Sequence, residues 1–112
     1  MKKVAIIDMG TNTFHLMFAE VLEKGFKILS REKVPVKIGV GGINQGYITN
    51  EGADRAMKAM RAFAESIKRE NASLARAIGT SAFRNAHNGP TIATELQKQT
   101  GIECEIISGI KE

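Results

Sequence analysis

The fold is decided by one stretch, VAIIDMGTNT at residues 4–13. It joins a short unbroken apolar run, residues 4–7, to a polar turn at residues 8–13. An apolar run of this length next to turn residues is typical of a strand that is buried on both faces. We therefore predict a central strand that ends in a tight turn.

Two further strands are predicted after this turn, at residues 14–22 and 26–38. In the second of them the apolar residues fall on even positions, which is the period of a strand. Pro35 cannot donate a hydrogen bond to a neighbouring strand, and such residues are tolerated mainly at sheet edges. This strand is therefore predicted at the margin of the sheet.

The second half of the sequence alternates helix and strand. A long amphipathic helix is predicted at residues 51–70, with Thr49 or Asn50 as its N-cap. Its expected apolar face comprises Ala53, Ala56, Met57, Met60, Ala64 and Ile67. The remaining elements are a strand at residues 75–78, a brief helix at 82–86, a helix at 90–99 and a strand at 102–107.

This order, β-β-β-α-β-α-β, predicts an α/β fold. Helical crossovers favour parallel pairing, whereas the first three strands form an antiparallel meander. The result is a mixed five-stranded sheet of the ribonuclease-H-like kind, with the helices packed on it and the third and last strands at its edges.

Composition narrows the class of protein. The chain has 112 residues, which corresponds to one domain, and 43% apolar with 25% charged residues is typical of a soluble globular protein. Its longest apolar stretch is interrupted by His15 and is too short to cross a membrane. The single cysteine, Cys104, predicts a cytoplasmic protein and is interpreted as a small buried residue, not a reactive thiol.

The net charge of +4 raises the question of nucleic-acid binding. Basic and acidic residues alternate along residues 54–70, aromatic residues make up only 5%, and no nucleic-acid-binding signature is present. The positive balance therefore favours a small polyanionic ligand over nucleic acid.

Three polar segments follow predicted strands, at residues 8–13, 79–84 and 108–112. Ligands of open α/β sheets bind outside the carboxyl ends of the strands, so we expect these segments to share one crevice. Asp8 either orients Mg²⁺ through water or caps the turn by accepting hydrogen bonds from Gly10 or Thr11. Arg84 either binds phosphate oxygens or forms a surface salt bridge, and His15 is interpreted as a packing residue.

The same segments resemble motifs of a known family. DMGTNTFH at residues 8–15 resembles the first phosphate motif, DLGSNSFH, of the exopolyphosphatase and guanosine pentaphosphate phosphohydrolase (Ppx/GppA) family, within the actin, Hsp70 and sugar-kinase superfamily. GTSAFR at residues 79–84 is similar to the family's GTxAxR, and EIISGIKE at residues 105–112 resembles its EIISGxxE.

This resemblance implies a Mg²⁺-dependent hydrolase of terminal phosphoanhydride bonds, acting on polyphosphate or on guanosine penta- or tetraphosphate. Asp8 is the metal candidate, and the resemblance implies that Glu112 is the general base on water. The phosphate-binding candidates are Gly10, Thr11, Asn12, Thr13, Ser81 and Arg84.

Members of this family are considerably longer and carry a second phosphate loop, DIGGGS, which the 112 residues lack. We therefore expect residues 1–112 to form an incomplete N-terminal domain whose partner is the C-terminal part of the same protein, with little or no hydrolase activity alone. Apolar surface exposed by such a piece predicts a homodimer. Two alternatives remain: half of an acetate or sugar kinase, and a non-catalytic actin-like module that binds nucleotide or polyphosphate.

Overall fold

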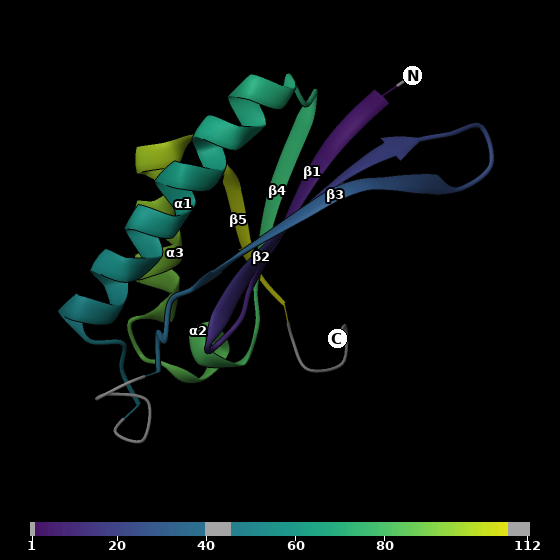
Figure 1. Ribbon diagram of the computed structural model, residues 1–112. Helices are drawn as coiled ribbons and strands as arrows, with labels where there is room; N and C mark the ends of the chain where they lie inside the picture. The colour runs from purple at the N-terminus through teal and green to yellow at the C-terminus, as the bar shows by residue number, and fades with distance from the viewer. Residues whose placement is uncertain (1, 40–45, 108–112) are drawn as a thin grey trace.

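The computed structural model describes residues 2–39 and 46–107, which form a five-stranded sheet and three helices (Figure 1). The strands are β1 (Lys2–Met9), β2 (Thr13–Val21), β3 (Phe26–Pro35), β4 (Leu74–Gly79) and β5 (Glu103–Ile106). The helices are α1 (Asn50–Glu70), α2 (Ser81–Asn85) and α3 (Gly89–Thr100). Every predicted element is present, in the predicted order.

The strands lie in the sheet in the order β3-β2-β1-β4-β5. β1, β2 and β3 pair antiparallel, whereas β4 pairs parallel with β1 and β5 pairs parallel with β4. The predicted mixed sheet is confirmed, with β3 and β5 at its edges. β3 ends at Pro35, earlier than predicted, because residues 36–38 leave the sheet and hydrogen-bond to the turn after β1.

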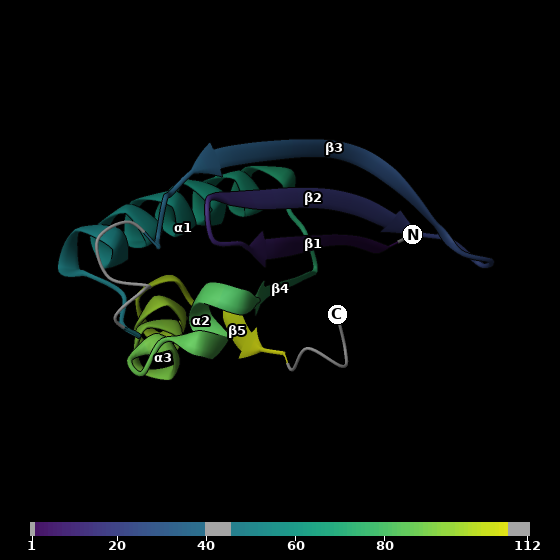
Figure 2. The same ribbon diagram turned by 90° about the horizontal axis from the view of Figure 1, so that it is seen from below.

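The helices α1 and α3 cover one face of this sheet (Figures 1 and 2). On that face Ile7 and Met9 of β1 are fully buried, whereas Ile6 is half-buried and Asp8 exposed on the other face. The expectation that β1 is buried on both faces is therefore wrong. Within the described residues no helix packs on the second face, which we call the open face.

Helix α1 begins after Thr49, one of the two predicted N-caps, whose hydroxyl accepts a hydrogen bond from the Gly52 amide at 3.0 Å. Its buried stripe is centred on Met60 and Phe63, and Phe63 was not part of the predicted apolar face. The helix is rotated so that this large ring, 1% exposed, faces the sheet. No helix in the described ranges is long and apolar enough to cross a membrane.

Cys104 lies on β5, half-buried and packed against the core. Burial raises the pKa of its thiol from 9.0 to about 11, because the charged thiolate is poorly solvated there. The interpretation of Cys104 as a packing residue agrees with this environment.

Candidate functional site

Two of the three predicted segments meet at the carboxyl ends of β1 and β4. The amide and the hydroxyl of Thr80 both donate to the Met9 carbonyl oxygen, each at 3.4 Å. The hydroxyl oxygens of Thr11 and Ser81 lie 3.4 Å apart. These contacts follow from the parallel pairing of the two strands, which places Met9 opposite Gly79.

The turn between β1 and β2 is tight, and its geometry requires glycine at position 10. A Cβ at Gly10 would lie 2.9 Å from the carbonyl oxygen of Thr13, the first residue of β2. Thr11 is half-buried and Asn12 is exposed. Glycine lets a ligand approach the backbone, whose amides and neighbouring hydroxyls are donors, so the turn can bind an anion.

Asp8 stands on the open face, just before this turn. It is exposed and lines a hollow of about 460 Å³ together with Thr80, Ser81 and Ile107. Within the described residues, its carboxylate makes no hydrogen bond to the amides of the turn. The capping role is therefore not observed, and the carboxylate is available to a ligand.

A second hollow, of about 280 Å³, adjoins the first on the open face and shares Asp8 with it. His15 and Arg31 line this second hollow. His15 lies opposite Asp8 in the β1–β2 register and is exposed. The interpretation of His15 as a packing residue is wrong, because nothing described covers this side of β2.

Arg84 is placed by the short helix α2, which is anchored by the buried ring of Phe83. That ring lies 6.2 Å from the ring of Phe14, next to the β1–β2 turn. The Nη1 of Arg84 donates to the Ile107 carbonyl oxygen at 3.2 Å. Ile107 also lines the hollow at Asp8, so Arg84 and Asp8 lie at the same end of the sheet.

The third predicted segment begins where β5 ends. The Ile107 amide donates to the Gly79 carbonyl oxygen at 3.1 Å, which brings the chain beside the Thr80 turn. Glu112, the candidate general base, and the rest of residues 108–112 lie outside the described residues. Their contribution to the site remains a prediction.

The side chains around Asp8 determine whether this site can hold Mg²⁺. Among residues 2–39 and 46–107, Asp8 is the one acidic residue that lines the 460 Å³ hollow, and no three His, Cys, Asp or Glu side chains gather there or elsewhere. Magnesium is commonly held by one or two carboxylates, with water and substrate phosphates as its other ligands. The site therefore fits Mg²⁺ that binds together with a phosphate ligand, and not a metal enclosed by protein alone.

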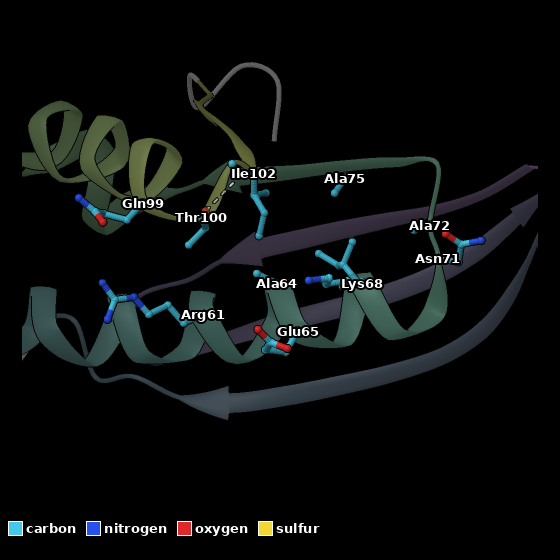
Figure 3. Close-up of a pocket in the computed structure, with 12 residues that line it drawn as sticks. Arg61, Ala64, Glu65, Lys68, Asn71, Ala72, Ala75, Gln99, Thr100 and Ile102 are labelled. Carbon is cyan, nitrogen blue, oxygen red and sulfur yellow. Dashed lines mark hydrogen bonds between the residues drawn. The ribbon is translucent and has the colours of Figure 1, made fainter.

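A larger groove, of about 620 Å³, lies elsewhere, between α1 and α3. Figure 3 shows Arg61 and Lys68 on its α1 side, and Gln99 and Thr100 on its α3 side. This groove is at the amino ends of β4 and β5, the opposite end from the Asp8 hollow. It is separate from the candidate site.

Some residues of the site were missed by sequence reasoning. Thr80 lines the hollow and belongs to segment 79–84, which was expected there, although it was not among the binding candidates. Ile107 was missed, and its place follows from the parallel pairing of β5 with β4. Arg31 was missed because only the pairing of β2 with β3 brings it near Asp8.

Fold and site together define an α/β domain in which polar turns meet at the carboxyl ends of the parallel strands β1 and β4. A family model described as the Ppx/GppA phosphatase family matches residues 17–112. This chain belongs to the Ppx/GppA phosphatase family, as its motifs predicted.

Solved structures agree with this membership. An exopolyphosphatase from Cytophaga hutchinsonii ATCC 33406 is 35% identical, with a TM-score of 0.93, over 99% of this chain and 36% of that chain. The Aquifex aeolicus PPX-GPPA enzyme is 20% identical, with a TM-score of 0.89, over 99% of this chain and 37% of that one. The present chain thus spans just over a third of the length of these relatives.

A more distant likeness bears on the fold alone. RuvC of T. thermophilus superimposes with a TM-score of 0.54 at 13% identity, over 99% of this chain and 67% of that chain. The predicted ribonuclease-H-like class is confirmed.

Proposed function

We propose that the complete protein hydrolyses terminal phosphoanhydride bonds of polyphosphate or of a guanosine pentaphosphate-type nucleotide, and that this chain supplies half of the site. The observation that carries the proposal is the junction of the β1–β2 turn with the turn after β4, with the Thr11 and Ser81 hydroxyl oxygens 3.4 Å apart. Family membership supports the reaction class.

In this proposal the amides and hydroxyls of Gly10, Thr11, Asn12 and Thr13 bind the terminal phosphate, and Ser81 adds a hydroxyl. Arg84 binds the polyanion from α2, and Asp8 holds Mg²⁺ through water. The metal, when bound, neutralises charge on the phosphoryl oxygens. Such transfer depends mostly on positioning and on stabilising charge, which donors of this kind supply.

Glu112 is proposed as the general base that orients and deprotonates the attacking water. In the complete protein, Glu112→Gln should abolish hydrolysis and leave polyphosphate binding nearly intact. If Glu112→Gln abolished polyphosphate binding instead, the assignment of Glu112 as general base would be contradicted.

The isolated chain is proposed to be nearly inactive, because no second phosphate loop is present in its 112 residues. The partner that completes it is the C-terminal part of the same protein, since the solved relatives are about three times as long. We also propose a cytoplasmic location, because a single cysteine cannot form a disulfide within these 112 residues.

Phosphate release from polyphosphate with Mg²⁺ tests this proposal. The 112-residue chain is assayed beside the Cytophaga hutchinsonii exopolyphosphatase at equal concentration. We expect no appreciable phosphate release by the short chain. Turnover equal to that of the full-length enzyme would contradict the proposal, and a strong preference for ATP over polyphosphate would favour the kinase alternative.

A further inference from the structure

The two hollows of the open face form one continuous path. The hollow of about 460 Å³ begins at Thr80 and Ser81. It meets the hollow of about 280 Å³ at Ile6 and Asp8, which line both. From Asp8 the second hollow crosses β2 and ends at Arg31 of β3. The path therefore leads from the turns of the candidate site to an edge strand of the sheet.

The strand register places Arg31 on this face. Ile6 of β1 pairs with Met17 of β2, and Met17 pairs with Arg31, so these three side chains form one row across the sheet. Asp8 and His15 form the next row, nearer the carboxyl end of β1. With strands about 4.8 Å apart and residues about 3.4 Å apart along a strand, the Cα atoms of Asp8 and Arg31 are roughly 12 Å apart. The two residues thus stand at opposite ends of the second hollow.

The Arg31 side chain is available to a ligand. It is exposed, and among residues 2–39 and 46–107 it makes no ion pair or hydrogen bond. Its acidic neighbour Glu32 does not neutralise it, because the Glu32 carboxylate accepts a hydrogen bond at 3.1 Å from Ser66 of α1, on the other face of the sheet. The guanidinium therefore keeps its full charge beside the hollow.

The charges along the path fit a chain of phosphate groups. Its inner end has the hydroxyl donors of Thr80 and Ser81, and its outer end has the guanidinium of Arg31, which can bind two phosphate oxygens at once. Between these ends the half-buried Ile6 and Met17 offer no side-chain donor. One phosphate group cannot contact both ends, so the full path suits a longer, unbranched anion.

We propose that Arg31 binds a phosphate group beyond the terminal one, so that the site holds a linear polyphosphate chain along the open face. The inference rests on the proposed function, in which the turns hold the terminal phosphate. Arg31 makes the affinity depend on chain length. Pyrophosphate occupies the turns alone, whereas a longer chain also reaches the guanidinium.

The test compares variants of the 112-residue chain with two ligands, pyrophosphate and long-chain linear polyphosphate, each with Mg²⁺. Arg31→Met removes the guanidinium, and Arg31→Lys keeps a cation without its two-pronged geometry. Arg61→Met is the remote control, because Arg61 is also exposed but lines the α1–α3 groove. Lys33→Met is the near control, because Lys33 is the next residue of β3 on the same face and does not line the hollow.

Calorimetry gives the affinities, and NMR follows the side-chain Nε signal of Arg31, which is identified by its absence from Arg31→Met. We expect Arg31→Met to bind polyphosphate at least about fivefold more weakly than the wild type and pyrophosphate within about twofold. Arg31→Lys should fall between the two proteins. Arg61→Met should keep the wild-type affinities, and Lys33→Met should lose less than Arg31→Met. In the wild type the Nε signal should shift with polyphosphate and not with pyrophosphate.

Three results would overturn the inference. They are an Arg31 Nε signal that polyphosphate leaves unchanged, an equal loss of polyphosphate affinity in Arg31→Met and in either control, and equal weakening of both ligands in Arg31→Met. A larger loss in Arg31→Met with guanosine tetraphosphate than with polyphosphate would also overturn it, by assigning the hollow to a nucleotide.

A different result would overturn the proposed function alone. In it, polyphosphate shifts the Arg31 signal, but neither ligand shifts the amide signals of Gly10, Thr11 and Asn12. Arg31 then binds a phosphate chain that the turn does not hold.

Discussion

Replacing Gly10 with alanine tests whether the shape of the β1–β2 turn determines the affinity for the ligand. The added Cβ would lie 2.9 Å from the Thr13 carbonyl oxygen, and since the neighbouring atom is backbone, the turn has to open. Crowding of this kind costs about 1–3 kcal/mol. In a domain of this size that corresponds to a melting temperature lower by roughly 4–12 °C.

Gly25→Ala is the matched control for this loss of stability. Gly25 lies in the turn between β2 and β3 with φ 85°, and an added Cβ there meets nothing within 4 Å. The left-handed backbone alone costs alanine about 1–2 kcal/mol. The two variants therefore lose comparable stability, but only Gly10→Ala changes the candidate anion site.

Circular dichroism melts give the two stabilities, and calorimetry with Mg²⁺ and tripolyphosphate gives the affinities. We expect binding to weaken at least about tenfold in Gly10→Ala and less than about twofold in Gly25→Ala. If Gly10→Ala melts at the lower temperature yet binds like the wild type, the turn does not hold the ligand. Equally weakened binding in both variants would mean that the loss of stability, and not the shape of the turn, lowers the affinity.

Three further predictions concern the scaffold. Phe63→Ala should lower the free energy of unfolding by about 3–5 kcal/mol in urea with little change in m, because the ring is 1% exposed; a loss below about 1 kcal/mol would contradict its place in the core. Gly89→Ala should destabilise more than Gly25→Ala in the same melts, because a Cβ at Gly89 would overlap the Phe83 carbonyl oxygen, and equal melting temperatures would speak against this packing. Burial raises the pKa of the Cys104 thiol from 9.0 to about 11, so the stability it contributes is complete below about pH 9 and is lost as the pH rises toward 11. Over that pH range the melting temperature of Cys104→Ala should therefore fall less than that of the wild type. An identical fall in both proteins would contradict the raised pKa of the thiol.

The elements of the fold were predictable because their signals are local. Alternation, helical spacing and turn residues predicted each strand and helix, and Pro35 predicted the edge position of β3. What covers each face of the sheet is not encoded locally. The open face of β1 and the rotation of α1 toward Phe63 therefore emerged only from the structure.

The site was predictable in part for a different reason. The rule that carboxyl ends of parallel strands share an edge predicted that Thr11 and Ser81 would lie together, and they do. Arg55 carries no sequence signal, because its hydrogen bonds to the carbonyl oxygens of Val36 and Lys37 depend on the path of the chain after β3, which is set by tertiary contacts. The exposure of His15 was equally hidden from the sequence, because it depends on whether another layer covers that side of β2. Within the described residues none does.

Backbone amides report most directly whether the two turns form one anion site. In an NMR titration of the chain with Mg²⁺ and tripolyphosphate, we expect the amide signals of Gly10, Thr11 and Asn12 to shift together with that of Ser81, all with a single dissociation constant. Shifts confined to one of the two turns, or to the groove at Arg61 and Lys68, would contradict a shared site.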